Sequence, residues 1–359
     1  MADPLLIVRD IVPWLAAYFI ISLSLNMEFG YLGIPNFGKV LTVAGGAFVM
    51  GSIPGLILSY VLDIYSKGLN YYDNNFSVVS GFFDPFLAAN PLFSIGLLLL
   101  TLIIAMAIGA ILGLLGSYPA LRLREDYLGM TLLAMGEILV SIGKYSKYPV
   151  NSSVGVTVPD FFAWISNYTL KQWIIIGILV ISALIIYFVI NRFVNSPLGR
   201  AMRAIRDNEV LAQSYGKDIV VYRRNVSMFA GAIAALAGAL LAMYFSTVVA
   251  DSYRRLDYTF YPWVIIVVGG LANNIGTFIG ASVFVVTLRL TDIYKFYLEP
   301  YLPFDVTFFT PLAFGIVLTL ILIFRPSGLL PEKPTYTLSI DEINSIMSKL
   351  KNKSDSRKS

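Results

Sequence analysis

The sequence contains no cysteine and no histidine among its 359 residues. The first absence excludes disulfides and thiolate chemistry, and the two together exclude most zinc sites. Without an imidazole, the chain has neither histidine ligation of haem nor histidine-based acid–base catalysis. Carboxylates would have to carry any enzymatic reaction, and no paired acids occur at a suitable spacing. We therefore expect a chain that is not an enzyme, with no catalytic residues, no metal and no cofactor of its own.

Charged residues are also scarce, at 13% of the chain, against roughly 25% in an ordinary soluble domain. Hydrophobic residues make up 57%. Long apolar blocks such as 92–117 and 172–194 reach the ~20 residues that a helix needs to cross a bilayer. The composition predicts an all-α, polytopic integral membrane helical bundle with about eight to ten transmembrane segments, located in the cell membrane. A net charge of +4 is typical of basic cytoplasmic loops, so no nucleic-acid partner is expected.

The basic residues set the expected sidedness of the chain. Positive charge accumulates on the cytoplasmic side of membrane proteins, so the segment 196–224, with six Lys/Arg against three acids, is expected inside. Arg122, Arg124 and a polar tail at 331–359 are expected on the same side. Residues 1–330 should form the transmembrane domain, with the first apolar block retained as a helix rather than cleaved as a signal peptide. The segments left outside are 63–91, 146–171, 249–262 and 291–306.

This sidedness leaves a difficulty at 263–290, because both of its ends must face outside. Its 28 residues cannot make two full crossings. The middle, "GGLANNIG", is a poor helix because Gly and Asn favour turns. We predict a broken or re-entrant pair of half-helices that meet around Gly269–Gly276, where non-helical backbone would face protein or water. A similar break is expected within the first 62 residues, where the candidates are Pro35, Gly45, Gly46, Pro54 and Gly55.

The charged segment 196–224 has the pattern of a short amphipathic helix between two spans. Ser196 suits the N-cap and Pro197 the first helical position, and the helix should end near Gly216. Helical spacing places Leu198, Met202 and Ile205 on one face, and Arg200, Arg203 and Asp207 on the other. Two interpretations stay open at this point. One is a helix that rests on lipid headgroups, and the other is a docking element for a cytosolic partner.

The stretch "SPLGRAMRAIRDNEVLAQSYGKDIVVYRRNVSMFAGAIAALAGAL" resembles the cytoplasmic loop of ABC-transporter permeases for branched-chain amino acids. The resemblance rests on Gly-Arg-Ala, on Ala-Ile-Arg-Asp-Asn-Glu, and on the basic start of an Ala/Gly-rich helix. Four further blocks are similar to the family in the same order: 22–38, 121–139, 267–281 and 320–330. "RLREDY" and "FRPSGLL" are most similar to the M-type permease. Two departures are Ile34-Pro35-Asn36 in a connector that is usually Gly-rich, and Ala272 where Gly is common.

The resemblance implies a permease subunit of an ABC importer for branched-chain or related amino acids, with 196–224 as the coupling segment that sits in a groove of the ATPase. The expected coupling residues are Gly199, Arg200, Arg203, Ala204, Arg206, Asp207, Glu209 and Gly216. No G-x-x-x-x-G-K-[ST] occurs, so partner subunits would bind ATP. The implied partners are a homologous permease or second copy, two ABC ATPase subunits, an extracellular or periplasmic solute-binding protein and membrane lipids. A stand-alone secondary transporter or channel is the alternative.

Four residues are candidates for the translocation path: Asn26, Glu137, Gly269 and Gly270. Glu137 lies about ten residues past the basic boundary, roughly 15 Å deep at helical rise, so its carboxyl should face the bundle or a cavity. It either lines the solute path or packs between helices as a hydrogen-bonded group. Asn26 and its neighbour Glu28 are open to an interfacial or structural role. The two glycines serve either solute contact or close packing at the helix break.

Overall fold

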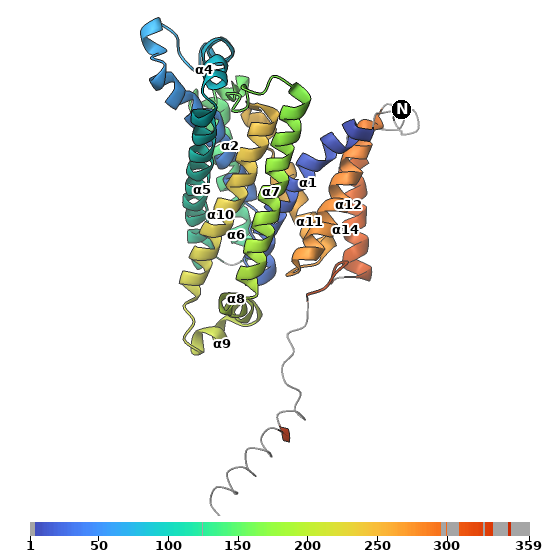
Figure 1. The fold of residues 1–359 in the computed structure, drawn as a ribbon. Helices are drawn as coiled ribbons and strands as arrows, with labels where there is room; N and C mark the ends of the chain where they lie inside the picture. Colours follow the sequence, from blue (N-terminus) through green and yellow to red (C-terminus); the bar gives the residue numbers. More distant parts are fainter. Residues whose placement is uncertain are drawn as a thin grey trace, which may run out of the picture.

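The computed structural model describes residues 4–123, 125–295, 299, 309–325, 327–332 and 344–345 of the chain. Seven helices in these residues are long and apolar enough to cross a membrane, and two shorter apolar helices accompany them (Figure 1). The predicted all-α membrane bundle is therefore confirmed. The long helices are α1 (Pro4–Asn26), α2 (Lys39–Val61), α5 (Pro91–Arg122), α6 (Glu125–Tyr145), α7 (Tyr168–Val194), α10 (Ile219–Phe245) and α12 (Asn274–Ile293), and the shorter ones are α11 (Tyr261–Gly269) and α14 (Phe309–Phe324).

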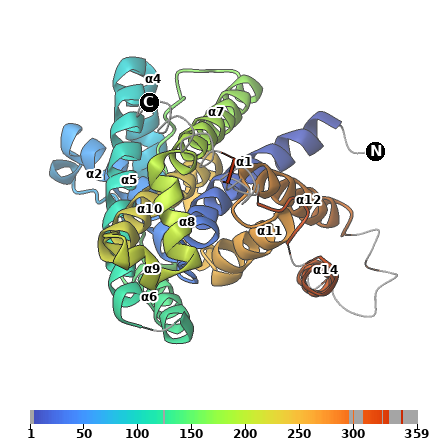
Figure 2. The same cartoon turned by 90° about the horizontal axis from the view of Figure 1, so that it is seen from below.

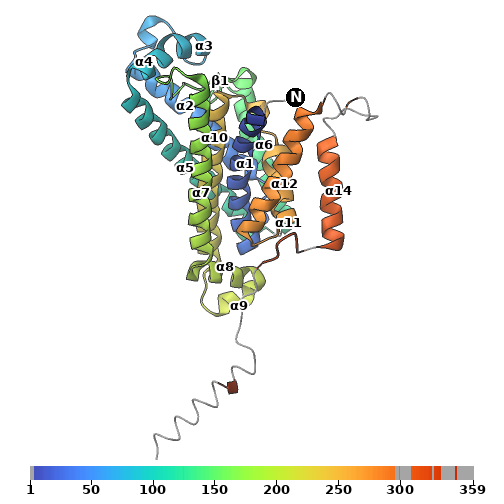
Figure 3. The same cartoon turned by 45° about the vertical axis from the view of Figure 1, so that its right-hand side comes forward.

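Short elements lie at the two ends of the bundle (Figure 3). One end, which we call the outer end, carries the short helices α3 (Asn75–Val78) and α4 (Asp84–Ala89). The strands β1 (Val156–Thr157) and β2 (Thr247–Val248) pair antiparallel there. The opposite, inner end carries α8 (Pro197–Asp207) and α9 (Glu209–Ser214). The described parts of the segments predicted to face outside thus share the end opposite the basic segment, while the predicted tail lies outside the described residues except for 331–332 and 344–345.

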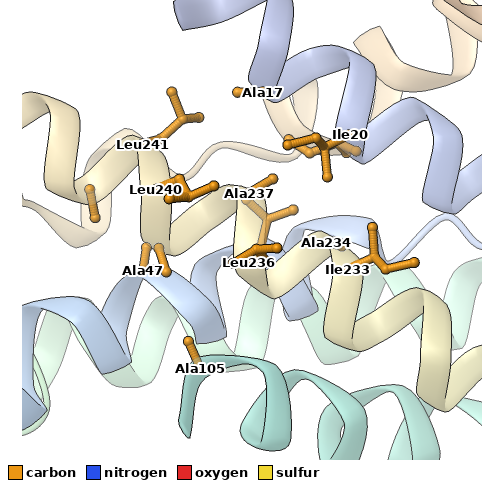
Figure 4. Packing of buried hydrophobic residues seen from close by; sticks show 14 of the residues in the cluster. Ala17, Ile20, Ala47, Ala105, Ile233, Ala234, Leu236, Ala237, Leu240 and Leu241 are labelled. Carbon is orange, nitrogen blue, oxygen red and sulfur yellow. The ribbon is translucent and has the colours of Figure 1, made fainter. Parts of the chain in front are cut away.

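The centre of the bundle is formed by α2 and α10, whose backbones touch (Figure 4). A Cβ on Gly46 would lie 1.9 Å from the carbonyl oxygen of Ala235, and one on Gly238 would lie 2.0 Å from that of Val43. Small residues allow this approach, which maximises dispersion contacts between membrane helices. The expected break at Gly45, Gly46, Pro54 and Gly55 is wrong, because α2 continues through them and its glycines serve close packing instead. The chain leaves helix geometry earlier, after the π-helical turn η1 (Met27–Tyr31) and before Lys39.

The predicted break between two membrane helices is confirmed at Gly270–Asn273. Gly270 has a φ of 116° and Ala272 one of 54°, so the chain reverses there, and the Asn273 side chain caps α12 by accepting bonds from two backbone N–H groups. The two helical segments on either side of the break have different bounds from those predicted. The descending limb begins at Leu256, in the π-helical turn η6 (Leu256–Phe260) that was assigned to the outer loop, and α12 alone is long enough to span a membrane. The turn therefore lies towards the inner end, near α8 (Figure 1).

The segment predicted as one amphipathic helix forms two. Ser196 caps α8 as expected, accepting from Leu198 N at 3.2 Å. Asn208 then adopts an extended backbone and its side chain accepts from Leu211 N at 3.0 Å, so it ends α8 and caps α9. Gly216, with a φ of 76°, follows α9 as the left-handed residue that ends it. Of the three residues predicted to share one face, Met202 and Ile205 are buried, whereas Leu198 is exposed.

Candidate functional site

The helices α8 and α9 lie across the inner end of the bundle (Figure 2). Met202 and Ile205 are completely buried and fix α8 against the bundle. Gly199 allows α8 to lie this close to the bundle, because a Cβ at residue 199 would lie 2.0 Å from the carbonyl oxygen of Val194 at the end of α7. Helix α8 therefore packs beneath the end of α7 at its only glycine. This is a structural reason for glycine at one of the expected coupling positions.

Two of the expected coupling arginines bind within the chain. Arg203 Nε donates to Glu332 Oε1 at 2.9 Å, and Arg206 Nη2 donates to Glu332 Oε2 at 2.9 Å. Arg206 Nη1 also donates to the carbonyl oxygen of Gly30 at 2.5 Å, and the Arg203 guanidinium lies over the ring of Tyr31, 5.0 Å from its centroid. Burial alone would lower the pKa of Arg206, but hydrogen bonds to Glu332 and Asp207 outweigh it and raise the pKa, so the side chain stays charged.

Glu332 belongs to a segment, 327–332, that is attached to the turn between α11 and α12. Leu329 N donates to Val268 O at 2.9 Å and Leu330 N donates to Gly269 O at 3.0 Å, which satisfies carbonyl groups at the end of α11. The Asn273 side chain donates to Pro331 O at 3.0 Å. We call 327–332 the C-terminal strap. It joins α8, through Glu332, to the α11–α12 turn.

The remaining expected coupling residues lie on the free surface of α8 and α9. Arg200, Ala204, Asp207, Glu209 and Gly216 are exposed. Apolar side chains that the sequence analysis did not single out share this surface: Leu211 is 56% exposed and Tyr215 83%. Arg223 at the start of α10 forms an ion pair with Glu209 and so holds α9 in place. A mixed apolar and charged surface of this kind is typical of a protein-docking site.

The connector between α1 and α2 contains a buried ion pair that the sequence analysis missed. Lys39 Nζ and Glu28 Oε2 are 2.7 Å apart, with side-chain exposures of 0% and 1%. The Asn36 amide donates to both carboxylate oxygens at 3.1 and 3.0 Å, and the indole of Trp263 donates to Asn36 O at 3.1 Å. Buried charges are tolerated only when paired and hydrogen-bonded in this way. The network ties the connector to α11, and Glu28 has a structural role.

Three of the four candidate path residues meet at the α11–α12 turn. Asn26 is completely buried and its side-chain oxygen accepts from Ala272 N at 2.9 Å. A Cβ on Gly269 would lie 2.2 Å from Gly276 O, and one on Gly270 would lie 2.0 Å from Leu330 O. This packing accounts for both glycines and for the asparagine without a solute. Their contact with a solute stays a prediction.

Glu137 does not face the bundle, contrary to the expectation drawn from its depth. Its side chain is 46% exposed, and its Oε1 lies 3.5 Å from Arg255 Nε. The helix α6 contacts α2 and α5 at the rim of the bundle, so part of its surface is uncovered (Figure 2). The exposed positions on it, among those whose burial is described, are Tyr127, Met130, Ala134, Ile138, Ser141, Ile142 and Tyr145. A carboxylate and a guanidinium on such a surface need water or another protein beside them.

Comparison with known proteins adds sequence relationships to this geometry. A family model described as "Branched-chain amino acid transport system / permease component" matches residues 7–325. The probable branched-chain amino acid transport permease protein LivM of Methanocaldococcus jannaschii is 36% identical over 336 residues, which cover 92% of this chain and 95% of that protein. The high-affinity branched-chain amino acid transport system permease protein LivM is 26% identical over 90% of this chain in Salmonella typhimurium, covering 69% of that protein. The protein of the same description from Escherichia coli is 28% identical over 64% of this chain and 56% of its own length.

Proposed function

The chain belongs to the family of branched-chain amino acid transport system permease components, and from that premise we propose that it is the membrane-spanning subunit of an ABC importer. The relatives named above are described as transporting branched-chain amino acids, and we propose the same or related amino acids as the solute of this chain. Its multi-pass bundle supplies the passage, and two separate ATPase subunits supply the energy. The observation that carries the proposal is the uncovered α8–α9 surface on a chain that has no P-loop sequence.

The ATPase subunit docks on the free surface of α8 and α9. Leu211 and Tyr215 insert into its groove as apolar anchors, and the exposed charges around them fix the orientation. Arg200, Asp207 and Glu209 are the charged coupling residues that face this partner. A lipid surface would suit a basic helix with its apolar side turned outward into the membrane, but the apolar side of α8 is already buried in the bundle. The burial of Met202 and Ile205 thus supports a protein partner.

Movement of the ATPase reaches the membrane helices through Glu332. The two ion pairs to Arg203 and Arg206 connect α8 to the C-terminal strap, and the strap is hydrogen-bonded to the last turn of α11. Arg206 also binds the backbone of η1 at the end of α1. A displacement of α8 therefore acts on α1 and on the α11–α12 turn together. The helices α1 and α11 contact each other, and both contact α12. They are therefore placed to open and close the inner end of the bundle.

A homologous permease or second copy of this chain covers the uncovered surface of α6. In the single chain the Glu137–Arg255 pair would face hydrocarbon for part of its surface, which is costly. A second permease placed there encloses the pair next to a hydrated passage, which makes Glu137 a residue of the translocation path. An external solute-binding protein delivers the amino acid at the outer end. These assignments complete the importer with two permeases, two ATPases and one binding protein.

Transport by reconstituted vesicles tests the proposal. We expect uptake of radiolabelled leucine only when the chain is assembled with its permease and ATPase partners, the binding protein is outside and ATP is inside. An ATPase partner whose P-loop lysine is replaced is the matched control and should abolish uptake without dissociating the complex. Uptake by this chain alone, driven by a proton or sodium gradient, would contradict the proposal and favour a secondary transporter.

A further inference from the structure

A pocket of about 500 Å³ lies at the outer end of the bundle, away from α8 and from the path candidates. Its walls come from α1, from the end of α10, from the 247–261 segment and from the last turns of α12. These elements lie beside one another in Figure 3. A volume of this size accommodates a small organic solute. None of the coupling or path residues discussed above lines it.

Four tyrosines line the pocket with unusual side-chain environments. Tyr18, Tyr253, Tyr258 and Tyr261 are only 3%, 5%, 5% and 8% exposed. Among the described residues, none of their hydroxyl groups has a hydrogen-bond partner, yet none is sealed from solvent. Buried tyrosine hydroxyls normally find a partner. Because the four rings are buried while their hydroxyl groups stay accessible, we infer that the hydroxyl groups face the pocket. A ligand there can form hydrogen bonds with them.

Charges of both signs reach the same pocket. The Asp257 carboxylate lines it and forms no ion pair within the described part of the chain. The Arg289 guanidinium lies over the Trp14 ring, 4.3 Å from its centroid, and Arg289 Nη1 is 3.0 Å from Asp292 Oδ2. Arg289 Nε lies 3.8 Å from Asp10 Oδ2 in a loose ion pair, and it is buried without a hydrogen-bond partner.

We propose that this pocket binds the transported solute as an α-amino-acid zwitterion before it moves inward. Asp257 receives the ammonium group, Arg289 Nε receives the carboxylate, and the aromatic rings with Leu288 contact the apolar side chain. The tyrosine hydroxyls complete the hydrogen bonds of both charged groups. The inference rests on the proposed function and adds to it the point at which this subunit holds its solute. A zwitterion matches the pocket because a simple cation would leave Arg289 Nε without a hydrogen bond and an anion would leave Asp257 without an ion pair.

Direct binding to the full-length chain tests the inference without transport. The purified chain is placed in nanodiscs of phosphatidylglycerol, which offer no ammonium headgroup, and titrated with radiolabelled leucine in the absence of ATPase and binding protein. We expect saturable binding that unlabelled leucine displaces. Leucinamide lacks the carboxylate and N-acetylleucine lacks the ammonium, so neither should displace leucine at comparable concentration. Displacement by leucinamide as effective as by leucine would overturn the zwitterion assignment.

Substitutions assign the two charges. Asp257→Asn and Arg289→Gln each remove one charge-assisted contact, so each should weaken leucine binding by about ten- to hundredfold. Tyr258→Phe keeps the ring and removes only the hydroxyl, so it should weaken binding by a smaller factor. Asp73→Asn is the matched control, because Asp73 is an outer-end carboxylate paired with Lys147 outside this pocket. A thermal unfolding temperature equal to that of the unsubstituted chain shows that each variant is folded.

The outcomes separate this inference from the proposed function. Loss of leucine binding in Asp257→Asn and Arg289→Gln, with retention in Asp73→Asn, supports the pocket. Unchanged binding in both pocket variants overturns it. If the unsubstituted chain binds no leucine while the assembled complex still shows ATP-dependent uptake, the pocket fails and the proposed function stands. If phosphatidylethanolamine in the nanodiscs abolishes leucine binding, the pocket holds a lipid headgroup in the membrane and the solute assignment is overturned.

Discussion

Replacing Glu332 with glutamine should uncouple transport from ATP hydrolysis. The carboxylate receives one charge-assisted hydrogen bond from Arg203 and one from Arg206, both at 2.9 Å, and the three side chains are between 21% and 28% exposed. Glutamine keeps the size and one acceptor oxygen but loses the charge. The C-terminal strap would stay on α11, because its backbone bonds do not involve the Glu332 side chain. The change therefore acts on the connection between α8 and the strap.

The size of the effect follows from those two bonds. Hydrogen bonds to charged groups contribute about 1.5–3 kcal/mol each, and partial exposure together with the remaining amide oxygen reduces the loss. We take the lost coupling as about 1–3 kcal/mol, which corresponds to roughly a 5–150-fold change in the equilibrium that links the two elements. The ATPase still docks, because its surface on α9 is untouched.

Proteoliposomes report both rates in one preparation. For Glu332→Gln we expect ATP hydrolysis to continue while the leucine transported per ATP falls at least fivefold, in line with that coupling range. Lys147→Gln is the control, since it breaks an exposed outer-end pair with Asp73 and should leave the ratio unchanged. Exchanging the charges of the two ion pairs, with Arg203→Glu, Arg206→Glu and Glu332→Arg combined in one variant, should recover part of the coupling. An unchanged leucine-to-ATP ratio in Glu332→Gln would refute the reasoning.

Three further predictions address docking and stability. Tyr215→Asp, at a side chain 83% exposed, should release the ATPase in co-purification and leave the thermal unfolding of the chain unchanged; retained co-purification would contradict the α9 docking surface. Gly46→Ala should lower the stability of the chain by about 1–3 kcal/mol, because its Cβ would lie 1.9 Å from Ala235 O, whereas Gly177→Ala, with open space around it, should be neutral or stabilising. Glu28→Gln should cost about 3–5 kcal/mol in unfolding measurements by leaving the Lys39 charge buried alone, and the double variant Glu28→Met, Lys39→Met should cost less.

The sequence predicts the helices well because long apolar blocks and cap residues act locally. Ser196 at the start of α8 and the Gly/Asn turn between α11 and α12 are examples. It predicts poorly which face of a helix is buried, because the packing of neighbouring helices determines that face. The depth of Glu137 follows from helical rise, but its exposed face depends on α2 and α5 packing on the opposite side of α6.

Contacts between distant segments were beyond sequence reasoning. Arg206 and Glu332 are 126 residues apart, and no spacing rule relates them. Polar residues around Asp257 suggested a loop, and only tertiary packing shows that η6 continues into α11. Lys39 and Glu28 are separated by a connector of irregular backbone, so no helical periodicity brings their charges together.

The C-terminal strap also has a consequence for the order in which the protein is made. A ribosome completes Arg203 and Arg206 well before it reaches Glu332, so during synthesis α8 exists for a time without the carboxylate that bridges its two guanidinium groups. Their carboxylate partner arrives only after α11, α12 and α14 have been synthesised. The connection between α8 and the C-terminal strap can therefore form only after these helices have been synthesised. A chain that stops short of residue 332 would present helix α9 to an ATPase without the strap that makes the interaction productive.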